Sequence, residues 1–146
     1  MILIDSNVCI AAVIETHVHH EASFGLLQSF RRGTAIIAAH SLAECYSTLT
    51  RGGAPYRWTG ARADAAIEVV LGELAVVALT AAQTRDAIRR FSAIGTGPQI
   101  YDYLIGATGE AHGARTIVTW NTRHFAPLFP HLAIVTPDAC PPPLRS

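Results

Sequence analysis

The chain has 146 residues, of which 50% are hydrophobic and 15% are charged, and this composition excludes a disordered protein. Its eleven basic and eleven acidic residues cancel, so net charge gives no support for a protein that coats nucleic acid. The apolar stretches are too short for a membrane span, and the aspartate at position 5 comes too early for a signal peptide. Three widely spaced cysteines indicate reduced thiols in a cytoplasmic protein. We expect one domain over residues 1–146, with a proline-rich tail at 138–146.

Short apolar runs alternate along the chain with stretches of helical periodicity. The apolar runs predict strands over residues 2–4, 34–39, 75–79 and 116–120, and an edge strand over 133–135. The periodic stretches predict helices over residues 8–14, 21–30, 42–49, 59–74, 80–94 and 100–112. Ser6 or Asn7 is the expected cap of the first helix, and glycine and proline predict loops at 52–55 and 95–98. Strands separated by helices indicate an α/β fold with a mostly parallel sheet of four to five strands, covered on both faces.

Four oxygen-bearing side chains lie at or near the predicted strand ends, where ligands bind in parallel sheets. Asp5 directly follows the first strand, and Asn121 directly follows the strand over 116–120. Glu44 lies early in the helix after the second strand, and Asp102 lies in the first turn of the helix before the 116–120 strand. We expect the four side chains to meet at one edge of the sheet. For Asp102 alone, a stabilising role at the start of its helix is an equal alternative.

This set of side chains suits a hard divalent cation. Carboxylates held close together in a partly dry crevice repel one another, and one of them takes up a proton unless a cation lies between them. Mg²⁺ and Mn²⁺ prefer oxygen ligands, and a water bound to such an ion can become a nucleophile. Glu44 is the only acid between Arg31 and Arg62, which makes a role as an ordinary surface charge harder to accept.

Four segments resemble the motifs of PIN-domain ribonucleases, and in particular those of the VapC-type toxins of bacterial type II toxin–antitoxin pairs. They are ILIDSNV at residues 2–8, LAECY at 42–46, YDYLIGA at 101–107 and IVTWNTRHF at 117–125. Their order and spacing cover nearly the whole chain, and four motifs in register are far more specific than any one of them. The resemblance implies a PIN-like three-layer α/β/α fold.

The resemblance also implies an endoribonuclease that hydrolyses RNA phosphodiester bonds with Mg²⁺ or Mn²⁺. By that resemblance Asp5, Glu44 and Asp102 are the catalytic acids and, together with Asn121, the metal ligands. Many family members have an aspartate at the position of Asn121, so a second ion is expected to bind weakly at most. Whether Asp102 or Glu44 orients the attacking water is left open by the sequence.

Substrate and partner contacts are expected outside the acids. The residues expected to bind RNA are Ser6 and Asn7, beside Asp5, and Arg51 and Arg57, beside the glycine–proline break. Tyr56 and Trp58 are candidates for base stacking, although hydrophobic packing is at least as good an interpretation of Trp58. As in VapC-type toxins, we expect a homodimer and a small VapB-type antitoxin whose tail covers the active site.

Several alternatives are weaker. Haloacid-dehalogenase-like phosphatases also place an aspartate after their first strand, but position 7 is asparagine and the chain contains no lysine. A PIN fold that has lost catalysis and only binds RNA or a partner is supported by Asn121 alone, and three intact acids oppose it. The histidine-rich turn at residues 17–20 lacks a second ligand cluster, so a solvated helix start is a better interpretation than a zinc site. Cys9 and Cys45 are expected to be buried free thiols.

Overall fold

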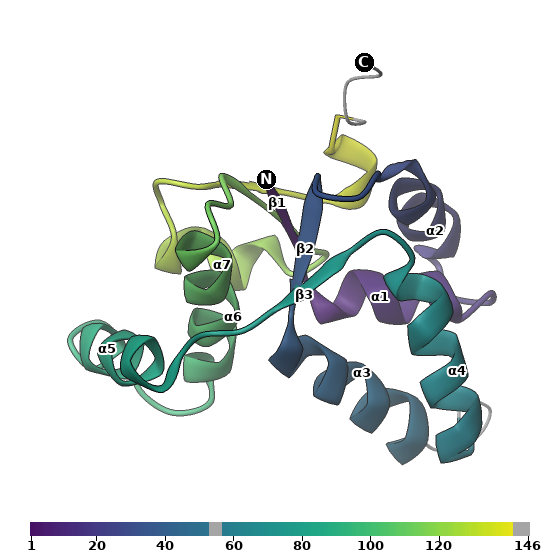
Figure 1. The fold of residues 1–146 in the computed structure, drawn as a ribbon, viewed down its shortest axis with the longest axis horizontal. Coiled ribbons are helices and arrows are strands. Elements are labelled where there is room, and N and C mark those ends of the chain that lie inside the picture. Colours follow the sequence, from purple (N-terminus) through teal and green to yellow (C-terminus); the bar gives the residue numbers. More distant parts are fainter. Residues whose placement is uncertain (53–56, 142–146) are drawn as a thin grey trace.

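A parallel sheet lies at the centre of the molecule in the computed structural model, which describes residues 1–52 and 57–141. Within these residues the sheet contains five parallel strands in the order β3–β2–β1–β4–β5 (Figure 1). The strands are β1 (Ile2–Ile4), β2 (Ala35–Ala38), β3 (Ala75–Val77), β4 (Thr116–Val118) and β5 (Ala133–Val135). The expected parallel sheet and its edge strand β5 are therefore confirmed.

The two faces of the sheet are covered by separate groups of helices, as Figure 1 shows. One face packs against α1 (Ser6–Val13), α2 (His20–Ser29), α3 (Ala39–Arg51) and α4 (Gly60–Leu71). The other face packs against α5 (Ala81–Phe91), α6 (Gln99–Ala111) and α7 (Thr122–Leu128). These layers confirm the expected three-layer α/β/α architecture.

The three central strands, β1, β2 and β4, are apolar on both sides because each contributes to two cores. In β1, Leu3 packs into the core on the side of α5–α7, whereas Ile4 packs into the core on the side of α1–α4. In β2, Ile36 and Ile37 divide between the two cores in the same way. Successive side chains of a strand point to opposite faces, so a strand buried on both faces has a continuous apolar run rather than an alternating one.

Helix α6 approaches the sheet closely because it carries glycine where other helices carry a side chain. A Cβ atom added at Gly109 would lie 2.7 Å from Leu3 Cδ2 in β1, and one added at Gly106 would collide with the ring of Phe129. Phe129 is 1% exposed, so its ring has little room to move. These contacts fix α6, and with it the position of Asp102 in its first turn.

Several helices and strands begin or end a few residues away from the expected positions, and three further differences go beyond such shifts. Helix α7 was not predicted, because Pro127 lies inside it and proline normally interrupts a helical pattern. The expected cap of α1 was wrong: Asp5 is the N-cap, and its side chain accepts the backbone N–H of Ser6. The start of the expected proline-rich tail forms a short 3₁₀ helix, η1 (Pro137–Ala139); residues 142–146 lie outside the described part.

A helix that spans a bilayer must be both long and apolar. None of the helices in residues 1–52 and 57–141 meets both conditions.

Candidate active site at the carboxyl edge of the sheet

Asp5 is the buried centre of the site. It follows the last residue of β1, and its backbone N–H donates to the carbonyl of Val118 in the neighbouring strand β4. Its Oδ1 accepts the backbone N–H of Ser6 at 2.7 Å, and its Oδ2 accepts the hydroxyl of Thr119 at 2.7 Å. The residue is only 4% exposed. The carboxylate is thus held in one orientation at the point where two central strands end.

The surroundings raise the pKa of Asp5 from 3.8 to about 6. Burial is the main cause, since it disfavours the charged form, and the nearby charges of Glu44 and Asp102 act in the same direction. The hydrogen bonds from Thr119 and from the Ser6 backbone oppose the shift. The charged form of Asp5 is therefore costly in the protein alone, and a cation at this position would relieve that cost.

Glu44 reaches the same edge from α3. Its Oε2 accepts the hydroxyl of Ser6 at 2.7 Å, and that hydroxyl also lies 3.4 Å from Asp5 Oδ1. Its Oε1 lies 3.3 Å from Nε2 of His40, one turn earlier in the helix. The ring of His40 stacks on that of Tyr101 from α6, with centroids 5.5 Å apart. Ser6 therefore connects the first two predicted acids, and His40 spans the distance from α3 to α6.

Asp102 lies at the rim of the site, where its side chain is 27% exposed. Its Oδ2 lies 3.2 Å from Nδ1 of His124 in α7, and the same nitrogen lies 2.8 Å from Nδ2 of Asn121. Asn121 is the N-cap of α7. The unpredicted helix α7 thus supplies the histidine that joins two of the predicted site residues.

Thr119 links the two sides of the site, although sequence reasoning missed it. Besides donating to Asp5, its hydroxyl accepts Nδ2 of Asn7 at 3.0 Å and the backbone N–H of Asn121 at 2.9 Å. The Oδ1 of Asn7 in turn accepts the backbone N–H of Trp120 at 3.1 Å. Thr119 is fully buried, and a hydroxyl at the end of a buried strand was the signal that could have identified it.

The four predicted side chains do not form a ready-made metal cage. Across the described ranges, no three His, Cys, Asp or Glu side chains are gathered closely enough to hold an ion. Their chemistry nevertheless fits a hard cation, because the donors are carboxylate and amide oxygens. The charges of Glu44 and Asp102 also act on the buried Asp5, which places all three acids within electrostatic reach of one another.

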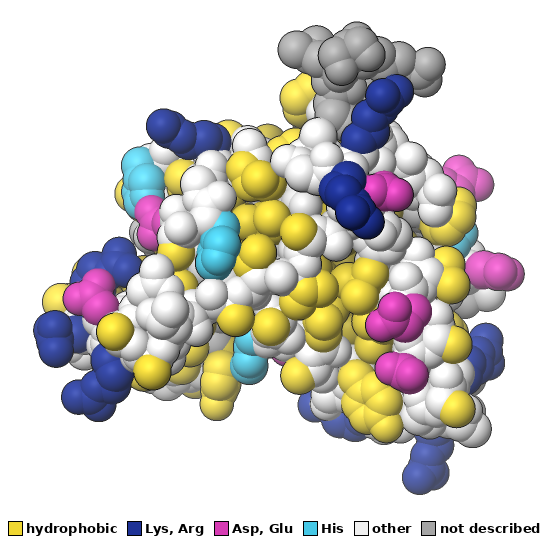
Figure 2. All heavy atoms as spheres, in the orientation of Figure 1, with side chains coloured by type: hydrophobic (Ala, Val, Ile, Leu, Met, Phe, Trp, Pro, Cys, Tyr) yellow, Lys and Arg dark blue, Asp and Glu magenta, His cyan; other side chains and the backbone are white. Residues whose placement is uncertain are grey.

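An open groove runs from Ser6 and Glu44 along α3. Its volume is about 450 Å³, and its lining includes Ser6, Glu44 and, at the end of the helix, the exposed Arg51. Figure 2 shows that the surface is notched between the α5–α6 side and the α3–α4 side of the molecule. Of the other residues expected to contact RNA, Arg57 is exposed outside this groove, and Tyr56 lies outside the described residues.

Trp58 packs against neighbouring side chains and does not present a free ring face for base stacking. It lies against the small core formed by α1, α3 and α4, and the guanidinium of Arg62 lies 4.0 Å from its ring centroid. This arrangement agrees with the interpretation of Trp58 as a packing residue.

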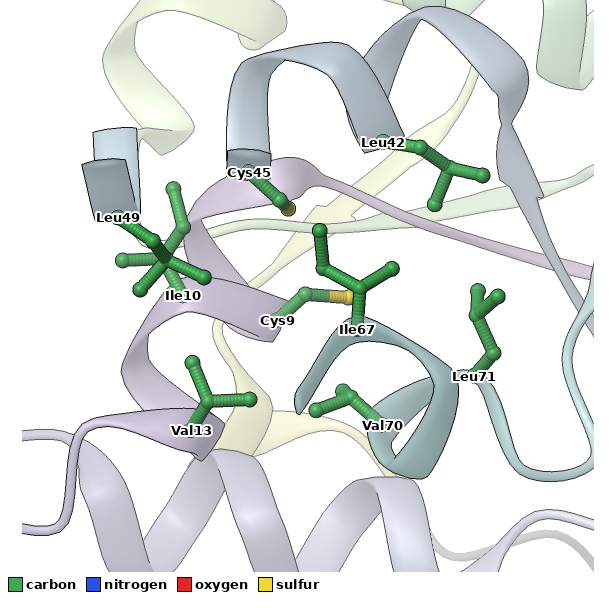
Figure 3. A pocket seen from close by; sticks show the side chains of 9 residues that line it. All are labelled: Cys9, Ile10, Val13, Leu42, Cys45, Leu49, Ile67, Val70 and Leu71. Atoms are coloured by element: carbon green, nitrogen blue, oxygen red, sulfur yellow. The ribbon is translucent and has the colours of Figure 1, made fainter. Parts of the chain in front are cut away.

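The cysteines lie in the apolar interior, away from the polar network of the acids. All three are free and buried, and Figure 3 shows Cys9 and Cys45 pointing into an apolar cavity between α1, α3 and α4. A hydrogen bond with Cys45, together with burial, raises the pKa of the Cys9 thiol well above its usual value. Cys9 and Cys45 are therefore buried free thiols, as expected.

Comparisons with known proteins agree with this arrangement. The sequence matches the PIN-domain family over residues 2–127. It is 32% identical to Ribonuclease VapC40 of Mycobacterium tuberculosis over 121 residues, which cover 80% of this chain and 84% of the relative.

Solved structures share the fold at lower identity. VapC20 of Mycobacterium tuberculosis, a toxin that cleaves the sarcin–ricin loop, superimposes with a TM-score of 0.69 at 17% identity, over 87% of this chain and 95% of that one. FitAcB from Neisseria gonorrhoeae gives a TM-score of 0.66 at 20% identity, over 96% and 100%. VapBC2 from Rickettsia felis, bound to a promoter DNA fragment, gives 0.64 at 19% identity, over 92% and 97%. With Asp5 at the carboxyl end of β1, Glu44 and Asp102 within electrostatic reach of it, and its sequence matched over most of its length, this chain belongs to the PIN-domain family, among the VapC-type ribonucleases.

Proposed function

We propose that this chain is the endoribonuclease toxin of a VapBC-type toxin–antitoxin pair and that it hydrolyses RNA phosphodiester bonds with the aid of Mg²⁺ or Mn²⁺. The observation that carries the proposal is the buried Asp5 carboxylate, with Glu44 connected to it through Ser6 and Asp102 acting on its pKa. The ribonuclease name of the sequence relative supports the reaction. The toxin name of a solved structure with the same fold supports the biological role.

The catalytic acids are Asp5, Glu44 and Asp102, and with Asn121 they would hold the ion. When bound, the ion would offset the charge of the scissile phosphate and lower the pKa of an attacking water. The chain itself fixes Asp5 through Thr119 and the Ser6 backbone. Either Glu44 or Asp102 accepts the proton of the water, because both carboxylates reach the edge of the site and are partly exposed.

The substrate side of the proposal rests on the groove along α3. Arg51 lies at its end and carries a charge that suits a phosphate of the RNA backbone. Ser6 and Asn7 lie beside Asp5, where they would position the scissile phosphate, and Arg57 would contact RNA further from the acids. A chain with no net charge has modest general affinity for polyanions, which favours a selective nuclease over one that degrades bulk RNA.

The proposed partner is a VapB-type antitoxin. Solved structures that share the fold are named as VapBC and FitAB complexes, which supports a protein partner of this type for the present chain. A homodimer is a further part of the proposal, taken from the family resemblance.

The experiment that tests the function is cleavage of total cellular RNA by the purified chain, free of antitoxin, with Mg²⁺ or Mn²⁺. Parallel reactions contain EDTA or the Asp102→Asn variant, and the cleaved ends are mapped. We expect discrete products that disappear in both controls. Products that persist with EDTA would contradict the metal dependence. If the folded protein gives no products with either ion, the result would favour a PIN fold that only binds RNA or a partner. Asn121→Asp would then be the first variant to test for restored activity.

A further inference from the structure

The turn between α1 and α2 forms one wall of a groove that the proposed function leaves unexplained. The groove has a volume of about 470 Å³, and its lining includes His17 and His19 of the turn, Trp120 after β4, and the amides Asn7 and Asn121. Asn7 and Asn121 both donate to the hydroxyl of Thr119, which donates to Asp5. The groove is therefore connected to the candidate active site through these two residues.

A stacked aromatic pair lines this groove. The rings of His19 and Trp120 lie with their centroids 3.7 Å apart and their planes within 9° of parallel. The backbone N–H of Trp120 donates to Asn7 Oδ1 at 3.1 Å, and its indole N–H donates to the buried hydroxyl of Ser23 at 2.9 Å. The indole also packs against the core on the side of α1–α4. One hydrogen bond and the core thus hold the indole, a second hydrogen bond holds its backbone, and the indole stacks on the imidazole.

Among the residues that the structure describes, those lining this groove include no acid and no arginine. His17 adds no charge at neutral pH, because burial and the neighbouring His19 and His20 lower its pKa, and its Nδ1 accepts the backbone N–H of His19. A phosphate would find neither an arginine nor a lysine in this lining, and the described residues contain no group of three His, Cys, Asp or Glu side chains that could hold a metal ion. A flat uncharged group would find an aromatic surface to extend.

We propose that this groove binds one unpaired nucleobase of the RNA strand, stacked on the His19–Trp120 pair, next to the phosphodiester held at the acids. The inference rests on the proposed function for its choice of RNA, and it makes the turn between α1 and α2 a determinant of where the strand is cut. Unstacked bases of single-stranded RNA commonly bind in this way, on aromatic side chains.

Trp120 can report the binding directly. The chain contains two tryptophans, so a Trp58→Phe variant leaves Trp120 as the sole indole, and Asp102→Asn in the same chain prevents cleavage. This double variant is titrated with an RNA trinucleotide and with an abasic ribose-phosphate trimer of the same charge. We expect the RNA to quench the Trp120 fluorescence saturably, whereas the abasic trimer binds about tenfold more weakly and leaves the fluorescence unchanged.

Substitutions at His19 separate stacking from packing. His19→Leu keeps an apolar side chain of similar size without a flat ring, and we expect the affinity for RNA to fall about tenfold, toward that of the abasic trimer. His19→Phe restores the flat ring and should restore most of the affinity. His131→Leu, an exposed histidine beside Phe129 on the α7 side of the molecule, serves as the control and should have no effect.

The outcomes distinguish this inference from the proposed function. Base-dependent quenching supports the groove even if the wild-type chain cleaves no RNA, in which case only the nuclease proposal fails. Cleavage by the wild-type chain, combined with equal binding of the abasic trimer or with no quenching by RNA, overturns the groove and leaves the nuclease. If His19→Leu does not fold, as judged by circular dichroism, the comparison of RNA with the abasic trimer still decides the question.

Discussion

The two sides of the candidate site are built in different ways. Asp5 is buried, and its two oxygens have fixed partners that come from the ends of β1 and β4. Asp102 is partly exposed and is paired with the exposed His124 from a separate helix. The first carboxylate is part of the core of the protein, whereas the second is a surface side chain placed beside it. The cost of the site in folding free energy is therefore concentrated at Asp5.

Replacing each acid by its amide tests this difference. Asp5 has a pKa of about 6 in the folded protein and 3.8 as its ordinary value, so ionisation above pH 6 weakens the folded state by about 3 kcal/mol. Asp5→Asn should therefore stabilise the metal-free protein by about 2–3 kcal/mol at pH 7.5 while it abolishes cleavage. Asp102→Asn should change the free energy of unfolding by less than about 0.5 kcal/mol. Urea unfolding in EDTA measures both.

The difference in stability between the wild type and Asp5→Asn should depend on pH. The folded state binds the Asp5 proton more tightly than the unfolded state, so the penalty is full above pH 6 and disappears as the pH falls toward 3.8. The advantage of Asp5→Asn should shrink over the same range. A divalent cation should stabilise the wild type and not this variant. An Asp5→Asn protein less stable than the wild type at pH 7.5 would show that the hydrogen bonds of the carboxylate outweigh its burial.

The same contrast explains what the sequence could and could not predict. Asp5 and Glu44 were identifiable because each follows a strand that is an apolar run, and the parallel sheet brings such positions to one edge. The partners His40 and His124 were not identifiable, because their contacts depend on how α3, α6 and α7 are placed. Helical periodicity indicates that a helix exists and not which side chains of two helices meet.

Errors in the local prediction have equally specific causes. The strand expected over 116–120 ends at Val118, and the next residue, Thr119, turns its hydroxyl into the network of Asp5. The apolar run that predicts the strand does not reveal where the strand ends. Likewise, a polar side chain before a helix predicts a cap at Ser6 or Asn7. The hydroxyl of Ser6 instead binds Glu44, which is 38 positions away in sequence, and only the tertiary structure shows such a partner.

A substitution in α6 tests how far the exposed side of the site depends on the core. Gly106→Ala adds a methyl group against the buried ring of Phe129, and the overpacking should exceed the gain in helix propensity, for a net loss of about 1–2 kcal/mol. The matched control is Gly25→Ala in α2, where a Cβ atom meets nothing within 4 Å, and which should stabilise the protein by about 0.5–1 kcal/mol. Urea unfolding of the two variants should give opposite signs. Destabilisation by both would point to a general intolerance of α-helical glycines.

The hydroxyl of Thr119 bonds both to Asp5, on the buried side of the site, and to the backbone of Asn121, on the side of Asp102. Removing it should therefore affect both sides. Thr119→Val keeps the shape of the side chain and loses the bonds to Asp5, Asn7 and the backbone of Asn121. We expect cleavage at neutral pH to fall about tenfold, as for other groups that orient metal ligands. The hydrogen bond from Thr119 lowers the pKa of Asp5, so the rise of kcat/KM with pH should move to higher pH. Thr119→Ser retains the hydroxyl and should retain the wild-type profile; an unchanged profile in Thr119→Val would remove Thr119 from the positioning of Asp5.

A last pair of variants tests whether every buried hydroxyl near the site contributes to its activity. Ser41, in the first turn of α3, is fully buried, and within the described part of the chain its hydroxyl has no hydrogen-bond partner. Ser41→Ala removes a polar atom that loses its hydration on folding, and should stabilise the protein by about 1 kcal/mol without changing cleavage. Ser23 is equally buried, but its hydroxyl accepts the indole N–H of Trp120. Ser23→Ala should therefore destabilise the protein by about 1 kcal/mol, because that N–H is left without a partner. Thermal and urea unfolding compare the two; a loss of cleavage in Ser41→Ala would mean that this hydroxyl acts on Glu44, and would extend the positioning network of the site along α3.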